Sequence, residues 1–397
     1  MFEKLTPRPP DAIMHLMAMA KADNNPDKID LGAGVYKSPQ GGVPIMRSVR
    51  QAEIDHLSQE TSKTYVSTVG HADFRRLLLE LVLGKNHKAL KEKRIASAQA
   101  TGGSGALRLG AEMIYQASPD ATIWVSTPTW ANHVPLISSA GFKMESYPYY
   151  NRETLGVDFD DMINCLKDKA KAGDVVLLHG CCHNPTGADL SPAEWDEVSA
   201  LMAEMKLIPF VDLAYFGLGR GMEEDSYGLR KVIELNDEVV VAASCSKNFG
   251  LYKERVGLIA VVAANAEQAS TVQTLLGATQ RRIVSMPPDH GASIVATILG
   301  SAELRADWIA ELTDMRERML GLRRALSEAL NVQGGEVIAR AVKDQNGMFS
   351  TLPLTQSQAE KLRSEHSVYL LNSGRMNIAG ASLNNIPRLA GAILDVL

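Results

Sequence analysis

Residues 238–262 read EVVVAASCSKNFGLYKERVGLIAVV, in which two apolar runs, Glu238–Ser244 and Val256–Val262, flank a polar loop. Runs that are apolar almost throughout are typical of strands buried on both faces of a sheet. The loop between them contains Lys247 and Arg255. This stretch therefore predicts two central strands, with a polar site where the first one ends.

The same alternation extends through the middle of the chain. Further apolar runs predict strands at Thr122–Ser126, Val175–His179 and Leu207–Asp212, and amphipathic segments predict helices at Ser191–Lys206 and Tyr227–Leu235. Strands that alternate with helices favour an α/β fold, in which helices sandwich a mostly parallel sheet.

Beyond residue 300 the pattern becomes that of a smaller α+β unit. A charge-rich stretch predicts one long helix at Glu303–Leu330. Short strands are expected at Glu336–Ala341 and Met348–Leu352, and helices at Gln356–Glu365 and Asn385–Val396. At 397 residues the chain is long enough for two domains.

Composition and charge limit the classes of partner. With 41 basic and 46 acidic residues the net charge is −5, which gives no polybasic surface for nucleic acid or for a membrane. Small molecules are therefore the expected partners. The four cysteines show no disulfide spacing, and the chain has neither a signal-peptide pattern nor a membrane-spanning run, so a cytoplasmic location is expected. His179 and His183 are too close to Cys181 and Cys182 in sequence for a tetrahedral zinc site, so no metal is expected.

Polar residues follow several of the predicted strands. Asp212 ends one strand, with Tyr215 three residues further on, and Asn184 lies in the turn after another. Ligands gather at the carboxyl ends of strands in open α/β sheets, so we expect these residues and Lys247 in one crevice. In that crevice the carboxylate of Asp212 suits a ligand with a pyridine ring, because the negative charge would keep the ring nitrogen protonated. The alternatives are an aspartate that caps a turn and a lysine exposed on a loop.

An anion site is predicted close to Lys247. The segment TGGSGALR, residues 101–108, predicts a helix start whose free N–H groups bind phosphate, and Ser244, Ser246 and Arg255 suit the same anion. Arg108 stands where a dinucleotide-binding fingerprint has its third glycine, and the chain contains no G-x-x-x-x-G-K-[ST] motif. The dehydrogenase and nucleoside-triphosphatase classes therefore lose their main support.

Two more side chains suit a small flat ligand and an amino-acid substrate. Trp130 follows the strand at 122–126 and suits stacking on a heterocycle, although a single tryptophan is more often part of a core. Arg375 suits bidentate binding of a carboxylate, the alternative being a surface arginine.

Together these motifs resemble one family. The segments LGAGVYK (31–37), HGCCHNPTG (179–187), DLAY (212–215) and SKNFGLYKERVG (246–257) resemble class I, fold-type I aminotransferases, and the chain is most similar to the bacterial aspartate and aromatic amino-acid branch. The resemblance covers the whole chain. It implies an N-terminal arm at 1–11, a large cofactor-binding domain at 43–302, and a small domain built from 12–42 and 303–397.

The resemblance also implies pyridoxal 5′-phosphate as the cofactor. Lys247 would carry it as a Schiff base and shuttle the proton, and Asp212, supported by His133, would pair with the pyridine nitrogen. Tyr215 and Asn184 would bond the phenolic oxygen. The other implied cofactor contacts are Gly103, Ser104, Trp130, Ser244, Ser246 and Arg255. The implied substrate contacts are Gly34, Trp130, Asn184 and Arg375.

Members of this family complete each active site across a homodimer. By that resemblance Tyr65 would reach the phosphate bound in the neighbouring subunit. Arg281 would bind the side-chain carboxylate of a dicarboxylic substrate. The choice of Arg281 over Arg282 follows from counting back from Pro287.

Some positions depart from the family pattern and bear on the substrate. Val43, Ser104, Phe216, Val284 and Met286 make the expected pocket more apolar or roomier. We therefore expect ping-pong transamination of aromatic amino acids, and of aspartate, with 2-oxoglutarate. The alternatives are an aspartate aminotransferase with little aromatic activity, β-elimination or decarboxylation on the same cofactor, and a DNA-reading regulator. The last would need a helix-turn-helix domain and a basic surface, and the sequence has neither.

Overall fold

A seven-stranded sheet forms the centre of the larger part of the protein. The computed structural model describes residues 1–7 and 11–397, so residues 8–10 of the expected N-terminal arm lie outside the described residues. The strand order is β2-β8-β7-β6-β5-β3-β4. The strands are β2 (Ile95–Thr101), β3 (Thr122–Thr127), β4 (Lys143–Pro148), β5 (Val175–His179), β6 (Ile208–Leu213), β7 (Val239–Ser244) and β8 (Val256–Val262).

The sheet is parallel except at one strand. β8 runs antiparallel to both of its neighbours, β2 and β7, and the other pairings are parallel. The five strands expected from apolar runs are therefore confirmed. β2 and β4 were not predicted.

Alternate residues of each central strand enter two different cores. In β7, Val240 and Ala242 pack with helix α5 (Gly102–Ala117) and helix α10 (Ala266–Val284) on one face of the sheet. Val239 and Val241 belong to the core on the other face. This double burial explains why the strands are apolar almost throughout.

The second face is covered by α8 (Pro192–Met205) and α9 (Met222–Leu235), which pack against each other. The helix expected at 191–206 is confirmed, and Ser191 caps it in a capping box with Glu194. The helix expected at 227–235 is the second half of α9. The remaining helices of this part are α2 (Arg47–Gln59), α3 (Ala72–Leu83), α4 (Lys88–Lys91), α6 (His133–Ser138), α7 (Phe159–Lys169) and α11 (His290–Gly300).

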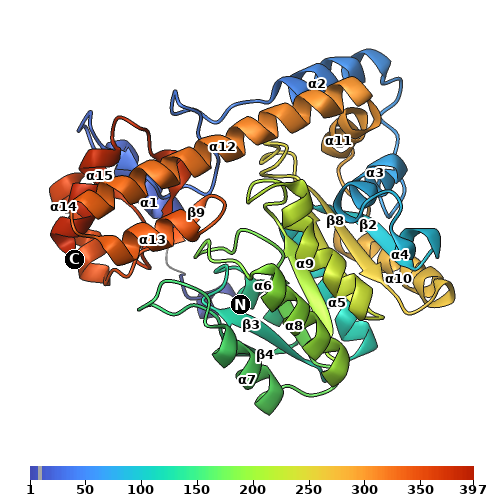
Figure 1. Ribbon diagram of the computed structural model, residues 1–397. Helices are drawn as coiled ribbons and strands as arrows, with labels where there is room; N and C mark the ends of the chain where they lie inside the picture. Colours follow the sequence, from blue (N-terminus) through green and yellow to red (C-terminus); the bar gives the residue numbers. More distant parts are fainter. Residues whose placement is uncertain (8–10) are drawn as a thin grey trace.

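Helix α12 (Ala302–Val332) connects the two parts of the molecule. It packs against α2 and α11 at one end and against α13 and α15 towards the other, and Figure 1 shows it as one long helix between these groups. The long helix expected at 303–330 is thereby confirmed. Its 31 residues span about 47 Å.

The smaller unit joins segments from both chain ends. β1 (Ile29–Asp30) pairs in parallel with β10 (Val368–Tyr369), and β9 (Phe349–Thr351) pairs antiparallel with β11 (Arg375–Asn377). Its helices are α1 (Ala12–Ala22), α13 (Glu336–Asp344), α14 (Gln356–His366) and α15 (Ile386–Val396). The expected strand at 348–352 and the helices at 356–365 and 385–396 are confirmed.

The strand expected at Glu336–Ala341 is wrong, because this segment is helix α13. Ile338, Ala339, Ala341 and Val342 are buried, whereas the residues between and around them are exposed. This spacing places the apolar side chains on one face of a helix.

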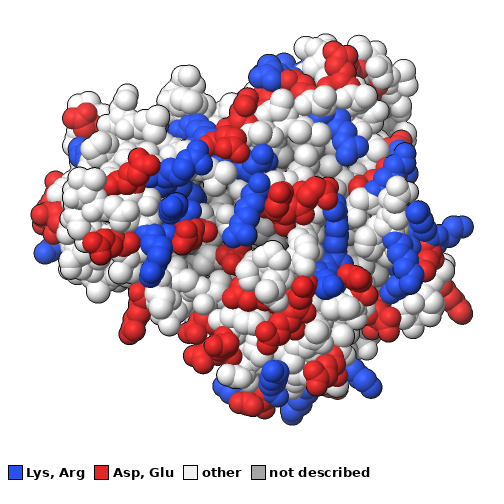
Figure 2. Space-filling view, viewed as in Figure 1, with Lys and Arg blue, Asp and Glu red and all other residues white. Residues whose placement is uncertain are grey.

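The surface has no single dominant charge on the face that Figure 2 shows, where acidic and basic side chains are interspersed. Within residues 1–7 and 11–397, no helix is both long enough and apolar enough to cross a membrane.

Candidate active site

A cavity lies where β5, β6 and β7 end, and it brings together most of the predicted site residues. It is lined by Gly103, Ser104, Leu107, Trp130, His179, Cys181, Asn184, Asp212, Ala214, Tyr215, Ser244, Ser246, Lys247 and Arg255. Neighbouring parallel strands end at the same edge of the sheet, which explains why residues distant in sequence meet there.

Asp212 presents one unpaired oxygen at this cavity. Its Oδ2 atom lies 3.0 Å from Nε2 of the fully buried His133. Its Oδ1 atom is buried and has no hydrogen-bond partner among the described residues. A buried carboxylate oxygen without a partner is costly, so the site suits a ligand that presents an N–H group to Asp212.

A chain of hydrogen bonds continues behind His133. Its Nδ1 atom lies 2.8 Å from Oγ1 of Thr129, which in turn lies 3.1 Å from Nε2 of His179. The carboxylate of Asp212 only accepts, so His133 carries its proton on Nε2. The hydroxyl of Thr129 then donates to His133 and accepts from His179. Burial, reinforced by nearby His133, lowers the pKa of His179 to about 3, which keeps His179 neutral.

Sequence reasoning gave no site role to Thr129 or His179. The available signal was the position of Thr129, four residues before His133 in the turn that leads into α6.

Lys247 follows β7, and its ammonium Nζ lies 5.1 Å from the centre of the Tyr215 ring. Burial lowers the pKa of the Lys247 amine, and the charges of Arg255 and Arg375 lower it further, while Asp212 offsets part of the change. A larger share of the amine is therefore unprotonated at neutral pH, the form that acts as a nucleophile and as a base.

Tyr215 and Asn184 form a pair on the cavity wall. The amide Nδ2 of Asn184 donates to the hydroxyl oxygen of Tyr215 over 3.2 Å. Burial raises the pKa of Tyr215, and Arg375 offsets this in part, so the phenol keeps its proton at neutral pH. That proton remains available to an acceptor in the cavity.

The start of α5 forms a cradle for an anion. Gly102 has φ +72°, and a Cβ atom there would lie 2.5 Å from Nη2 of Arg255. A Cβ atom on Gly103 would lie 3.1 Å from Cβ of Ser244. The two glycines therefore let the guanidinium and the serine approach the free N–H groups of the helix, a combination that suits phosphate.

Arg375 comes from β11 of the smaller unit and is 5% exposed. Its Nη2 atom donates to the carbonyl of Gly32 over 2.9 Å, and its guanidinium carbon lies 4.4 Å from the centre of the Phe349 ring. Its Nε atom is buried without a partner in the described part of the chain. Gly34 lies close by, where a Cβ atom would be 3.5 Å from Phe349.

Five predicted site residues do not line the cavity, namely His133, Gly34, Arg375, Tyr65 and Arg281, and the last two are exposed on this chain. Tyr65 is 86% exposed, and Arg281 is exposed in the last turn of α10. Within the described residues the Arg281 side chain makes no hydrogen bond or ion pair, whereas Nη2 of Arg282 donates to Thr279 over 3.2 Å. Arg281 is therefore the freer of the two arginines.

The five substituted positions differ in burial, since Ser104 lines the cavity and Met286 is half-buried. Val43 and Val284 are exposed. Phe216 is 1% exposed, belongs to the core and does not line the cavity, so its expected contribution to an apolar pocket is wrong. Its side chain belongs to the larger hydrophobic core, which also contains buried residues of α8 and α9.

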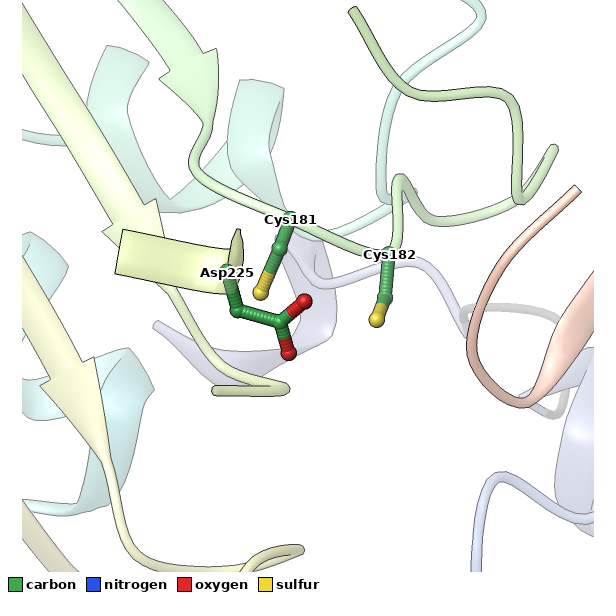
Figure 3. Close-up of side chains that lie close together, drawn as sticks. All are labelled: Cys181, Cys182 and Asp225. Atoms are coloured by element: carbon green, nitrogen blue, oxygen red, sulfur yellow. The ribbon is translucent and has the colours of Figure 1, made fainter. Parts of the chain in front are cut away.

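Cys181, which lines the cavity, lies close to Cys182 and Asp225. The ligating atoms of these three residues lie within 4.8 Å of one another, and Figure 3 shows the carboxylate of Asp225 between the two sulfur atoms in this view. Sequence reasoning considered the cysteines with the nearby histidines and did not include Asp225. The carboxylate accepts the backbone N–H groups of Gly217, Gly219 and Arg220, each over 2.9 Å. It therefore holds the loop that follows Tyr215.

Residues 26–393 match the family model described as aminotransferase class I and II. The chain is 44% identical to an aromatic-amino-acid aminotransferase of Paracoccus denitrificans over 396 residues, and 44% identical to an aspartate aminotransferase of Escherichia coli strain K12 over 397 residues. Both alignments cover 100% of each chain.

Solved structures show the same likeness. An aromatic amino acid aminotransferase with 3-indolebutyric acid has a TM-score of 0.96 and 43% identity, with 100% of both chains covered. The aromatic-amino-acid aminotransferase of Burkholderia pseudomallei, covalently bound to pyridoxal phosphate, has a TM-score of 0.97 and 38% identity, with 100% of this chain and 99% of that chain covered.

Proposed function

This chain belongs to the class I and II aminotransferases, and we propose that it uses pyridoxal 5′-phosphate to transfer amino groups from aromatic amino acids and from aspartate to 2-oxoglutarate. The reaction follows a ping-pong scheme, in which the donor leaves as an oxo acid before the acceptor binds. Relatives named for aromatic amino acids and for aspartate match this chain equally well, which supports both donors.

The unpaired Oδ1 of Asp212 is the observation that carries the assignment of the cofactor. A protonated pyridine nitrogen satisfies this oxygen, and the cradle of Gly103, Ser244 and Arg255 suits the phosphate. When bound, the cofactor supplies an electron-withdrawing ring that stabilises negative charge on the substrate α-carbon. The residues of the cavity thus fit both the ring nitrogen and the phosphate of the cofactor.

The side chains of the cavity have separate roles in this proposal. Lys247 would hold the cofactor covalently until the substrate amine displaces it. The freed Nζ atom, with its lowered pKa, would then take the proton from the α-carbon of the donor amino acid and, in the second half-reaction, deliver a proton to the carbon that becomes the α-carbon of the product amino acid. Tyr215 and Asn184 would hold the phenolic oxygen, and Trp130 would lie against the ring. His133 keeps Asp212 oriented. Ser104 and Ser246 would complete the phosphate contacts.

Arg375 would bind the α-carboxylate of the substrate, with Gly34, Trp130 and Asn184 around it. Its buried Nε atom, which lacks a partner among the residues described, supports this role because a guanidinium binds a carboxylate through two N–H groups.

We propose that the active site is completed in a homodimer. Tyr65 and Arg281 are both exposed on the single chain, as residues that serve a neighbouring site would be. Tyr65 would bind the neighbour's phosphate, and Arg281 the side-chain carboxylate of aspartate or 2-oxoglutarate. The apolar positions Val43, Val284 and Met286 would accommodate an aromatic side chain at the same place.

Single-turnover absorbance tests this function. Purified protein loaded with cofactor is mixed separately with phenylalanine, tyrosine and aspartate, and the band of the lysine-bound cofactor is followed. All three amino acids should discharge it. Reaction with aspartate alone would favour an aspartate aminotransferase with little aromatic activity.

A lysine variant tests the cofactor assignment. Lys247→Ala should remove the band and lower kcat at least about 10⁴-fold, because the base and the covalent anchor are lost together. The matched control is Lys253→Ala, an exposed lysine of the same loop, which should keep the band. A band that survives Lys247→Ala would contradict the assignment.

A further inference from the structure

Arg323 of α12 is a buried cation without a carboxylate partner in the part of the chain that the structure describes. It is 1% exposed and forms no ion pair within 4.0 Å. Its guanidinium instead donates to the carbonyls of Val342 (3.0 Å), Asn346 (3.2 Å), Gly347 (2.8 Å) and Phe349 (2.7 Å) and to Oγ of Ser350 (2.8 Å). Burial lowers the pKa of Arg323 to about 10, so it is still charged at neutral pH.

Most of these acceptors belong to one short segment, residues 346–350. A buried charge is costly unless every donor is satisfied, and here all the N–H groups of the guanidinium point at this segment or at the end of α13. The planar guanidinium of one arginine, with its five N–H groups, thus fixes several carbonyls of the segment at once.

On one side, the segment supports the substrate arginine. The Phe349 ring lies under the Arg375 guanidinium, 4.4 Å from its central carbon, and meets the Tyr215 ring edge-on at 5.9 Å. Thr351, which directly follows the segment, is the β-sheet partner of Arg375. A shift of the segment would therefore move Arg375.

On the other side, the segment is attached to the residues that follow Asn184. The backbone N–H of Asn346 donates to the carbonyl of Gly187 over 2.7 Å, and Oγ1 of Thr351 donates to the carbonyl of Pro185 over 2.9 Å. Gly187 has φ +72°, and a Cβ atom there would lie 2.1 Å from the carbonyl oxygen of Phe349. The two backbones are therefore in close contact.

We propose that Arg323 is a positioning residue, which sets the separation of Arg375 from Asn184 by fixing the segment between them. This inference rests on the proposed function, because it assigns Arg375 to the substrate carboxylate and Asn184 to the cofactor side. Arg323 contacts neither group itself. Its effect is on the affinity for the carboxylate, since a small misplacement of a binding group costs much of its contribution.

Chemical rescue tests the proposal. Arg323→Gly removes the side chain, and the dissociation constant of 3-indolepropionic acid is measured on the cofactor-loaded protein. This ligand has a carboxylate and no amino group, so it binds without reacting. We expect at least about tenfold weaker binding. Added guanidinium, far below denaturing concentrations, should restore most of the affinity, and ammonium at the same concentration should not.

The matched control is Arg324→Gly. Arg324 is the next residue of α12 and is exposed, so this variant places a glycine in the same helix without touching the segment. Its dissociation constant should stay within twofold of the wild-type value. If Arg323→Gly does not fold, Arg323→Lys is used instead, because it keeps the positive charge but loses the planar guanidinium. This variant should also bind 3-indolepropionic acid at least several-fold more weakly than the wild type.

Two results would overturn the role of Arg323. One is a folded Arg323→Gly or Arg323→Lys variant that binds 3-indolepropionic acid as the wild type does. The other is guanidinium that raises the melting temperature without restoring the affinity, which would make the role merely structural. Failure of the proposed function is separate, because it would appear as a wild-type protein without the cofactor band.

Discussion

The contact between Gly102 and Arg255 shows how one missing side chain can shape a binding site. Gly102 combines φ +72° with a closest approach of 2.5 Å between its would-be Cβ atom and Arg255. Both the backbone conformation and the space exclude other residues there.

We expect Gly102→Ala to displace Arg255 and weaken cofactor binding at least about tenfold, because a charge-assisted phosphate contact is lost. Titration of the apoprotein with pyridoxal 5′-phosphate measures this. The control is Gly321→Ala in the middle of α12, where the new Cβ atom meets nothing closer than 4.0 Å. That variant should leave cofactor binding unchanged and stabilise the helix by up to about 1 kcal/mol. Unchanged cofactor affinity in Gly102→Ala would contradict the expectation.

At the same scale, some site residues could be predicted from sequence and others could not. Lys247 and Asp212 follow apolar strands, and parallel strands bring their ends together, so their meeting follows from the fold. Thr129 is half-buried and Arg323 is buried, and only the packed structure determines the partners of these two polar residues. No local pattern marks such residues, because the same residue types are common on surfaces.

Secondary structure elements were predictable where burial was uniform. The central strands of the sheet are apolar on both faces, and all of them were found. β2 reads IASAQAT, and its alanines are buried without the branched side chains that usually indicate a strand. β4 reads KMESYP and lies at the sheet edge, where polar residues replace the apolar signal. Both strands were therefore missed.

The start of α9 depends on one carboxylate for its connection to the site. Asp225 accepts three backbone N–H groups of the loop at 217–220, which follows Tyr215. Asp225→Ala leaves three N–H donors without their acceptor, two of them buried, and we expect the free energy of unfolding to fall by about 3 kcal/mol or more.

Urea denaturation of the apoprotein at fixed concentration measures this change. Glu224→Ala is the matched control, because this exposed neighbour lies in the same helical turn and should alter stability by less than about 0.5 kcal/mol. Equal stabilities of the two variants would show that water replaces the carboxylate.

For the whole molecule, the proposed sharing of active sites across a homodimer can be tested by mixing two defective subunits. Lys247→Ala and Arg281→Leu should each be nearly inactive with aspartate and 2-oxoglutarate. A hybrid dimer would contain one site with an intact Lys247 from one subunit and an intact Arg281 from the other. Co-expression with random pairing should therefore recover roughly a quarter of the wild-type activity. A mixture that stays inactive would place Arg281 in its own subunit's site.

Acid should destabilise the whole fold through its buried histidines. The pKa of His179 is lowered to about 3 by burial from an ordinary value of 6.5, and the pKa of His183 is lowered in the same way. Below pH 6.5 the unfolded chain binds protons that the folded protein does not bind. Each histidine therefore removes about 1.4 kcal/mol of stability per pH unit in this range.

Asp225 opposes part of this change, because burial raises its pKa to about 6 and the folded protein then binds the extra proton between 6 and 3.8. Burial also raises the pKa of Asp189 and lowers the pKa of His87, which adds one group to each side. With three histidines against two aspartates, the unfolding free energy should fall as the pH is lowered from neutral to about 4. Urea denaturation at each pH measures the slope, which should be shallower by one proton in His179→Gln. An unchanged slope in that variant would contradict the assignment.

The pairing of β1 with β10 has a consequence for how the protein is made. Ile29 pairs with Val368, and the carbonyl of Leu31 accepts the backbone N–H of Asn377. The strand β1 therefore cannot form its hydrogen bonds until residues near the end of the chain have been synthesised. Once residue 262 has been synthesised, all strands of the central sheet are present, but β1 still lacks its partner strand β10. A product cut short before residue 368 would keep the sheet and lack Arg375 altogether. The part of the enzyme that would bind the α-carboxylate of the substrate is thus the last to be completed during translation.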